Sequence, residues 1–469
     1  MGRDGSHANQ GFDMTSAPRL LVSALALSLT PWLPALAQTA APAPQTPPAP
    51  QTEAPVPAET PAAAGIGEAP VAPARPDGYS GDYAVLQPLA EAPGVIELPD
   101  GTTGPYLPST VETVTWGYLP NRDAEPLMTV ESGATVVIDT LSHEGILEDQ
   151  GRDPVAYFGS KGVPEDAVLA DAIAVAASDI EHDFFKDGPH VVTGPIAIEG
   201  AEPGDVLKVE TLELLPRVPY GVVSNRHGKG ALVGEFPETP PPDPNASPEQ
   251  PELYHNVSVF TPLRLNDSRL FGVMHNRDQA EVVFPANPFL GILGVAADTS
   301  EKVHSVPPGK HGGNLDISMV GVGTTLYLPV QVPGALFYAS DPHAAQGNGE
   351  VALTALELSM RAKLRVTLLK KGDPAIPYET LAQPFAETDE FWMPVGLNED
   401  LDEAMKDAVR QSIAFLTGTL NMDRPTALAY LSAATDFNIS QVVDRTKGVH
   451  AQIRKADFAT IRGAEEAAE

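Results

Sequence analysis

The sequence predicts a mainly β protein with helical additions, an α+β fold whose main helices lie near the C-terminus. Two observations lead to this prediction. Short runs rich in β-branched residues alternate with turn signals through most of the chain, and helical periodicity is concentrated after residue 400. With 469 residues, 42% of them hydrophobic, the chain is long enough to bury a sizeable core.

The N-terminus is predicted to be a signal peptide over residues 1–37. Arg19 precedes an apolar run at residues 20–29, which is too short to span the roughly 30 Å hydrocarbon core of a membrane. Ala35 and Ala37 suit the small-residue positions before a signal-peptidase cleavage site. We therefore expect a periplasmic or secreted protein, with an uncleaved N-terminal anchor as the alternative.

Proline marks two further segments. Residues 38–76 consist largely of Ala and Pro, with few large apolar side chains to offset the entropy lost on ordering, and are predicted to be a disordered linker. Residues 77–469 are predicted to form one folded domain. A second proline cluster, at residues 237–251, is interpreted as a surface loop inserted in that domain, with a linker between two domains as the alternative.

The β-branched runs give the expected strands in order. They cover residues 113–118, 134–139, 206–211, 257–260, 279–284, 325–330 and 350–358. Before the third of these runs, Pro203 and Gly204 stand where a turn needs them, so a strand–turn–strand unit is expected over residues 195–214.

Three helices are expected. Residues 400–418 carry an apolar stripe, with Asp402 and Glu403 in the first turn, where negative charge is favourable. Residues 425–437 continue as a second helix that begins with a proline. A shorter helix is expected over residues 164–177.

Charge and cysteine content exclude several classes of function. The chain has 29 Lys+Arg against 62 Asp+Glu, a net charge of −33, so neither nucleic acid nor an anionic lipid surface is an expected partner. The absence of cysteine excludes disulfides, thiolate nucleophiles and Cys-ligated metals. Any metal ion must therefore bind to His, Asp, Glu or backbone oxygen.

The densest group of polar residues lies between residues 304 and 350. Two adjacent glycines bring His311, Asn314 and Asp316 into one loop, although an exposed glycine turn is the simpler alternative. Further on, an apolar strand leads to His343, and a Gln-Gly-Asn-Gly turn returns the chain at Glu350. One imidazole and two carboxylates, from His343, Asp316 and Glu350, can hold a divalent ion and leave coordination positions for water and substrate.

Three other histidines are weaker candidates for the pocket. His143 follows a predicted strand in a polar loop, His190 precedes another predicted strand, and His227 lies in a Gly-rich segment. A histidine that titrates near neutrality suits catalysis, but hydrogen-bonded structural roles are equally compatible with these positions. The glycine patterns match neither a P-loop nor a Gly-x-Ser-x-Gly nucleophile elbow.

Four separate motifs together resemble the acetamidase/formamidase family. They are residues 193–205, 289–296, 311–316 and 341–350, whose order and spacing match over about residues 110–450. The resemblance implies a sandwich-like β body and self-association into a dimer or larger homo-oligomer. It also implies hydrolysis of small amides such as formamide and acetamide to carboxylate and ammonia at a divalent-metal site, with zinc as the expected ion.

The resemblance also implies residue roles. Asp316 and His343 are expected as metal ligands, Glu350 as a ligand or as the base that activates water, and His311 and Asn314 as groups that orient the amide. The family usually has Asp at the position of Asn348, so a negative charge is missing from the turn before Glu350. Two alternatives therefore stay open, a non-catalytic binding protein on the same scaffold and a different metal-dependent reaction such as oxygen activation.

Overall fold

The computed structural model describes residues 84–266, 269–379 and 381–461, all within one compact unit, Gly65–Glu469. The predicted signal peptide and linker lie outside the described residues and stay predictions. In the part of the chain that the structure describes, no helix is both long enough and apolar enough to cross a membrane.

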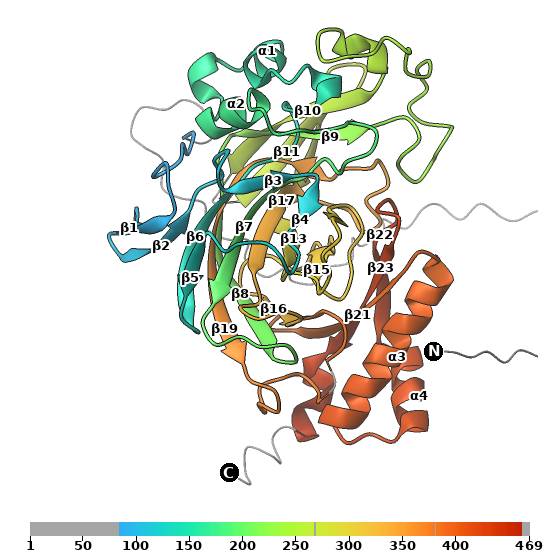
Figure 1. The fold of residues 1–469 in the computed structure, drawn as a ribbon. Helices are drawn as coiled ribbons and strands as arrows, with labels where there is room; N and C mark the ends of the chain where they lie inside the picture. Colours follow the sequence, from blue (N-terminus) through green and yellow to red (C-terminus); the bar gives the residue numbers. More distant parts are fainter. Residues whose placement is uncertain (1–83, 267–268, 380, 462–469) are drawn as a thin grey trace, which may run out of the picture. The chain divides into compact units, whose positions relative to one another are not determined.

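Two large sheets, mostly antiparallel, and a small two-stranded sheet make up the fold (Figure 1). The ten-stranded sheet contains, in spatial order, β1 (Gly94–Glu97), β2 (Thr103–Leu107), β6 (Ala134–Thr140), β19 (Met360–Leu369), β8 (Val206–Pro216), β16 (Thr325–Pro329), β20 (Phe385–Glu387), β21 (Phe391–Asn398), β23 (Lys447–Arg454) and β22 (Asp436–Gln441). The eleven-stranded sheet contains β12 (Glu281–Pro285), β11 (Arg269–His275), β10 (Val257–Asn266), β9 (Tyr220–Asn225), β18 (Leu356–Glu357), β17 (Phe337–Ala345), β13 (Phe289–Gly294) and β15 (Gly312–Asn314), with β7 (Val191–Ile198) joined to β17, β3 (Val114–Trp116) and β5 (Met128–Val130). The third sheet pairs β14 (Val303–His304) with β4 (Tyr118–Leu119). The expected mainly β fold class is confirmed.

Residues from both large sheets contribute to one hydrophobic core. Along β19, Ala362, Leu364 and Val366 are fully buried, whereas Lys363 and Arg365 between them are more exposed. Side chains of successive strand residues point to opposite faces, so this alternation turns one face of the strand toward the core.

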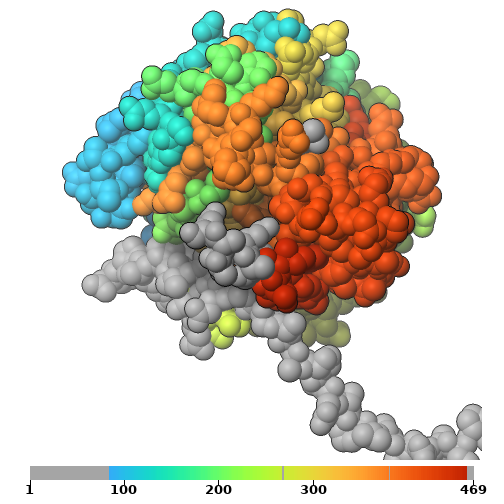
Figure 2. All heavy atoms as spheres, turned by 90° about the horizontal axis from the view of Figure 1, so that it is seen from below, coloured from blue at the N-terminus to red at the C-terminus, as the bar shows by residue number. Residues whose placement is uncertain are grey.

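The C-terminal helices are confirmed as α3 (Leu401–Thr419) and α4 (Arg424–Ala434). Asp400 caps α3 by accepting hydrogen bonds from the backbone N–H groups of Asp402 and Glu403, at 2.9 and 3.1 Å. α3 lies close against β21 because Gly396 has no side chain there, since a Cβ atom would come within 2.2 Å of the Ala408 nitrogen. Figure 2 shows α3 and α4 as an orange-to-red region of the face seen from below.

Two expected elements differ from the structure. The helix expected over residues 164–177 is split into a short 3₁₀ turn, Glu165–Ala167, and α2 (Ala170–Ala176), because Val168 and Leu169 adopt extended backbone and bury their side chains in the core. The strand expected over residues 350–358 is mostly loop, and only β18 remains.

Connections between elements also differ from the simplest expectation. β7 and β8, which follow each other around the expected turn at residues 201–205, belong to different sheets and so carry the chain from one sheet to the other. The proline cluster at residues 237–251 lies in the connection between β9 and β10, which pair with each other from Asn225 and Val257 to Tyr220 and Pro262. A further short helix, α1 (Pro154–Gly159), lies beside α2 at the end away from α3 (Figure 1).

A buried ion network ties the N-terminal strands to this body. The Arg217 side chain is fully buried and donates two hydrogen bonds to Asp171 in α2, at 2.7 and 3.1 Å. Arg361 in β19 donates two to Asp139 in β6, at 2.7 and 2.8 Å, and Asp139 also lies 3.7 Å from Arg217. Two buried guanidinium groups therefore depend on two carboxylates for their charge compensation.

We predict that Asp171→Ala destabilises the fold by about 3–5 kcal/mol, because it leaves the buried Arg217 guanidinium without its bidentate partner. Urea unfolding monitored by circular dichroism measures the change. Asp100→Ala serves as the control, because it removes an exposed carboxylate that pairs with Lys363 at 2.6 Å and should shift the midpoint far less. Equal shifts in the two variants would contradict the role assigned to the network.

Candidate active site

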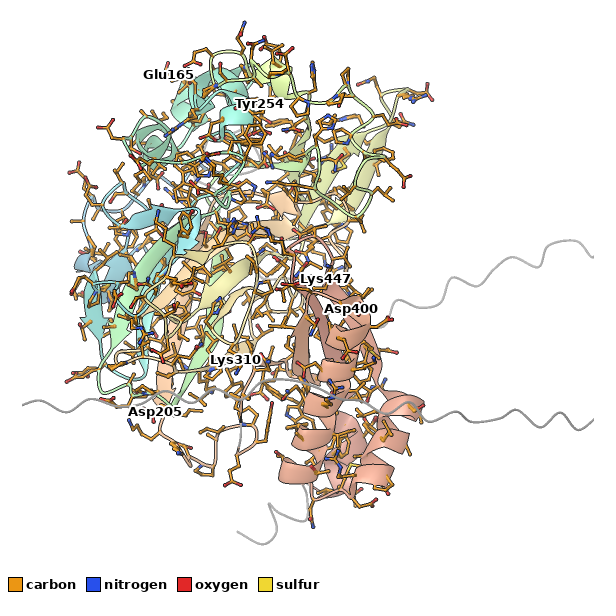
Figure 3. The ribbon with its side chains drawn as sticks, turned by 45° about the vertical axis from the view of Figure 1, so that its right-hand side comes forward. Glu165, Asp205, Tyr254, Lys310, Asp400 and Lys447 are labelled. Atoms are coloured by element: carbon orange, nitrogen blue, oxygen red, sulfur yellow. The ribbon has the colours of Figure 1, made fainter. Side chains whose placement is uncertain are left out.

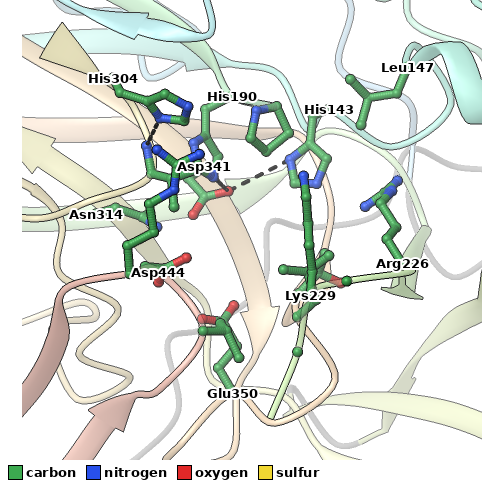
Figure 4. Close-up of a pocket in the computed structure, with 18 of the residues that line it drawn as sticks. His143, Leu147, His190, Arg226, Lys229, His304, Asn314, Asp341, Glu350 and Asp444 are labelled. Atoms are coloured by element: carbon green, nitrogen blue, oxygen red, sulfur yellow. Dashed lines mark hydrogen bonds and ion pairs between the residues drawn. The ribbon is translucent and has the colours of Figure 1, made fainter. Parts of the chain in front are cut away.

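A cavity of about 350 Å³ opens where loops from both sheets meet (Figure 4). Its inner wall consists of buried polar groups, among them His143, His190, Asp341, Glu350 and Asp444. Its outer wall is more exposed and contains apolar and basic side chains, namely Phe184, Phe185, Val233, Leu353, Lys229, Arg445 and Lys447. A cavity of this size and composition is typical of a site for a small molecule.

Two imidazoles reach the inner wall from neighbouring strand ends. His143 follows β6 and His190 precedes β7, and an isolated bridge between Leu141 and Val191 holds the two segments together. Their rings meet edge to face, with centroids 5.6 Å apart. His190 Nδ1 contacts Ser305 Oγ at 2.8 Å, which directs its Nε2 toward Asp341 Oδ1, 3.6 Å away.

The strand β17 supplies Asp341 and His343, two residues apart. His343 Nε2 lies 3.1 Å from Asp341 Oδ2 and 3.0 Å from Glu357 Oε1 on the adjacent strand β18, where His343 and Glu357 are directly opposite. His343 Nδ1 lies 3.7 Å from Asp316 Oδ1. The central imidazole is thus surrounded by three carboxylates.

Gly291 on β13 forms the floor beneath this group. A Cβ atom there would come within 2.4 Å of Asp316 Oδ1, 2.6 Å of Asp341 Oδ2 and 2.7 Å of His343 Cε1. The Gly291 carbonyl also accepts the backbone N–H groups of Leu315 and Asp316, at 3.0 and 3.3 Å, which fixes the loop that carries Asp316. Gly291, which belongs to the motif at residues 289–296, therefore leaves the space in which these three side chains converge.

Two more carboxylates complete the cluster from loops. Glu350 lies in the β17–β18 connection, and Asp444 lies in the turn between β22 and β23. The backbone of Gly349 bonds to Ser440 and Val442, at 3.0 and 3.2 Å, so the C-terminal hairpin and the Glu350 loop are joined. Asp316, Glu350 and Asp444 offer oxygen atoms that lie within 4.8 Å of one another.

Three of these carboxylate residues have unusual backbone conformations. The φ angles of Asp316, Asp341 and Glu350 are +50°, +54° and +48°. Non-glycine residues rarely adopt this left-handed region, and when they do so together they mark a site at which function sets the geometry.

Burial and mutual repulsion perturb the carboxylates strongly. Burial, together with Asp444 and Asp341, raises the pKa of Asp316 well above its usual value. Burial, together with Asp316, likewise raises the pKa of Glu350, and burial with Glu350 raises that of Asp444. Three carboxyl groups this close and this dry cannot all ionise without a cation between them.

The imidazoles divide into a charged and a neutral group. Burial opposes protonation of His343, but Asp341 and Glu357 outweigh it and raise the pKa of His343 well above its usual value. Burial lowers the pKa of His190 to about 3, although Asp341 counteracts it in part, so His190 is neutral at physiological pH. A neutral imidazole is the form that binds a metal ion, so His190 can bind in its present state, whereas His343 would have to release its proton when an ion takes the place of that positive charge.

The donor set fits a divalent metal ion. Several buried nitrogen and oxygen atoms of the cluster have no hydrogen-bond partner among the described residues, and they include both Asp316 carboxylate oxygens, Asp341 Oδ1, His343 Nδ1, Glu357 Oε2 and Asp444 Oδ2. Buried polar atoms are normally satisfied, so an unpaired group of this size indicates a missing partner. Four overlapping triads have ligand atoms within 4.8 Å: His143, His190 and Asp341; Asp316, Asp341 and His343; His343, Glu350 and Glu357; Asp316, Glu350 and Asp444.

The sequence analysis expected three metal ligands, Asp316, His343 and Glu350. In the structure, any two of them occur together in one of the triads. Each pair is completed to a triad by a residue that the sequence analysis did not select: Asp341, Glu357 or Asp444. Asp341 had a signal, because it stands two residues before His343 on a strand and therefore shares its face.

The other expected residues divide between the cavity and its surroundings. Asn314, His143 and His190 line the cavity, and Asn314 Oδ1 has no hydrogen-bond partner in the described ranges. His311 is buried in its own loop against Gly309 and Gly313 and is not among the lining residues. His227 lies outside as well, where its Nε2 contacts Thr239 Oγ1 at 3.1 Å.

Asn348, the expected departure from the family pattern, lies outside the cluster. Its side chain is exposed and accepts a hydrogen bond from Ser318 Oγ at 3.2 Å. The substitution therefore removes no carboxylate from the group around His343.

Comparisons with known proteins agree with the motifs. Residues 295–453 match the sequence profile described as the acetamidase/formamidase family, a range that contains Asp316, Asp341, His343, Glu350 and Asp444. The chain is 26% identical to a formamidase from Methylophilus methylotrophus over 237 residues, which are 42% of this chain and 56% of that protein. It is 28% identical to an acetamidase from Mycolicibacterium smegmatis over 223 residues, 39% and 54% of the two chains. The match spans about half the length of these relatives.

Solved structures show the same fold. An acetamidase from Bacillus halodurans superposes with a TM-score of 0.57 at 24% identity, covering 76% of this chain and 99% of the other. An acetamidase from Yersinia enterocolitica gives 0.56 at 24% identity, covering 76% and 93%. The resemblance inferred from the motifs is confirmed by the match of residues 295–453 to the acetamidase/formamidase family profile.

Proposed function

We propose that this protein is a metal-dependent amidohydrolase that cleaves the C–N bond of a small linear amide to give a carboxylate and ammonia. The observation that carries the proposal is the buried cluster around His343 at the inner end of the cavity, with its unpaired donor atoms and the space above Gly291. The names of the relatives, formamidase and acetamidase, support the same reaction class.

The metal ion would be held by Asp316, Asp341 and His343. Asp341 also forms a triad with His143 and His190, which offer two further nitrogen donors. Oxygen and imidazole donors of this kind suit zinc, which we propose as the ion. When bound, a divalent ion lowers the pKa of water toward neutrality and stabilises negative charge on the amide oxygen.

The residues of this chain would perform the remaining tasks. Glu350 lines the cavity beside the ligands, where it can take a proton from the attacking water and pass it to the leaving nitrogen. The unpaired Asn314 Oδ1 can accept a hydrogen bond from the amide NH₂ group and so orient the substrate. The burial of these groups excludes bulk water and strengthens their electrostatic interactions.

Two further parts of the proposal come from the sequence. The signal-peptide pattern at residues 1–37 supports export to the periplasm or beyond, and the family resemblance supports a homo-oligomer. Asn348 is exposed and lies outside the carboxylate cluster, so we expect that having Asn here instead of Asp does not reduce activity.

We predict that Asp316→Ala and His343→Ala lower the metal content of the purified protein, because each removes a ligand that the remaining groups cannot replace. Elemental analysis of dialysed protein measures the stoichiometry. His227→Ala is the matched control, since this histidine lies outside the cavity and its loss should leave the metal content unchanged. Full stoichiometric metal in both ligand variants would refute the assignment.

We predict that Glu350→Gln reduces turnover of the substrate amide by about 10²–10⁴-fold. The glutamine side chain keeps the size of the glutamate side chain but cannot take up the proton of the attacking water. Ammonia release under saturating substrate measures the rate, and bound metal measured alongside separates a base from a ligand.

Asn348→Asp tests the departure from the family pattern in the same assay. Since this side chain is exposed, restoring the carboxylate should leave the rate unchanged. A large gain of activity would contradict the structural placement of Asn348, and a fully metallated wild-type protein that releases no ammonia from any amide would favour the non-catalytic binding protein instead.

A further inference from the structure

The two ends of the cavity carry opposite charge. The inner end is acidic and buried, with Asp341, Glu350 and Asp444 each less than 8% exposed. The basic side chains Lys229, Arg445 and Lys447 line the same cavity toward solvent. This contrast is unexpected for a chain of net charge −33.

Among the described residues, Lys229 is a cavity-lining cation that has no carboxylate partner in an ion pair. In the described part of the chain its ammonium group forms no ion pair or hydrogen bond, and its near neighbour is the ring of Phe184, 5.8 Å away. Two acidic groups, Asp149 and Asp444, act on it without forming an ion pair. Asp149 already accepts hydrogen bonds from Arg226 at 2.8 Å and from Asn256 at 2.9 Å. Burial, with Arg226 adding to it, lowers the pKa of Lys229 to about 8. A partly buried, uncompensated cation is costly unless an anion reaches it from outside.

The basic residues at the mouth differ in how they are held. Lys447 begins β23 near Asp400 at the start of α3 (Figure 3), and its ammonium donates to the Glu399 carbonyl at 2.6 Å. Arg445 is exposed, and no ion pair of its side chain occurs within the described ranges. Lys229 extends from its loop toward the His143 side of the cavity (Figure 4). Lys229 and Arg445 are therefore both available to a bound molecule.

Part of the cavity wall is apolar, and the cavity is larger than a one-carbon amide needs. The cavity of about 350 Å³ lies within the range of sites for whole small molecules. Leu353, Val233 and Phe184 are among its lining residues. A short hydrocarbon segment fits this wall, with a polar group at each end.

We propose that the substrate carries a carboxylate, so that it is a monoamide of a short dicarboxylic acid whose amide lies at the His343 cluster and whose carboxylate pairs with Lys229. The inference rests on the proposed amidase function and adds the substrate class. Water adds to the amide carbon, the C–N bond breaks and the leaving nitrogen takes up protons, so the anionic monoamide and water give a dicarboxylate and an ammonium ion.

Three amides of equal chain length and different charge test the inference: succinamate, butanamide and β-alaninamide, which carry a negative charge, no charge and a positive charge at the far end. Ammonia release gives kcat/KM for each with the full-length, metal-loaded protein. We expect succinamate to exceed butanamide by about 10- to 100-fold, the worth of one charge-assisted contact, and β-alaninamide to be the poorest.

Lys229 variants identify the group responsible. Lys229→Met should reduce the succinamate-to-butanamide ratio at least about tenfold, and Lys229→Glu should reverse the order in favour of β-alaninamide. Lys371→Met, which removes an exposed cation that does not line the cavity, is the control and should keep the wild-type ratio. Equal kcat/KM for the three amides in the wild type, or a ratio that Lys229→Met leaves unchanged, would overturn the inference while leaving the amidase function intact.

A separate measurement covers failure of the proposed reaction. If none of the three amides releases ammonia, the amidase proposal fails, and calorimetric binding of succinate then tests the anion site alone. Binding that weakens at least about tenfold in Lys229→Met supports the site. No binding, or equal binding by both proteins, overturns it.

Discussion

The structure depends on one electrostatic constraint, the burial of several carboxylates around the imidazole of His343. Asp316, Glu357 and Asp341 surround that ring, and Glu350 and Asp444 lie against Asp316, all of them almost inaccessible to solvent. Transferring an ionised carboxylate from water into the protein interior costs roughly several kcal/mol of free energy, unless a counter-charge and hydrogen bonds replace the solvent. His343 compensates part of this charge, and the unpaired oxygens of the cluster require another cation.

The rest of the fold can be understood as the support for this cluster. Its members are separated by up to about three hundred positions along the chain, and the sheets bring them together. His143 lies just after β6 and His190 just before β7, whereas β17 carries Asp341 and His343 and the turn between β22 and β23 carries Asp444. Gly291 leaves the space in which the side chains converge. Three left-handed backbone conformations aim the carboxylates inward, a local strain that the surrounding sheets and core can offset.

The sequence predicted the fold class and the two C-terminal helices because periodicity and capping are local properties. It also led to Asp316, His343 and Glu350, because glycine-bounded loops after strands are recognisable. Asp444 had no such signal, since an Asp between two unpredicted strands looks like any turn residue, and only tertiary pairing with the Gly349 loop brings it to the site. Lys229 was not predicted either, because only the tertiary fold brings its loop to the cavity. The single helix expected at residues 164–177 is not formed, because burial of Val168 in the core outweighs the helical periodicity of this segment.

The most direct test of the central claim is the urea unfolding midpoint of metal-stripped protein titrated with zinc. An ion that binds the folded cluster and not the unfolded chain should stabilise the fold by about 2.7 kcal/mol at a free concentration one hundred times its Kd. We expect the unfolding midpoint to rise with the concentration of free zinc, as this linkage between binding and folding requires. A midpoint that stays constant across the whole titration would contradict it, because the buried carboxylates would then be stable without a cation.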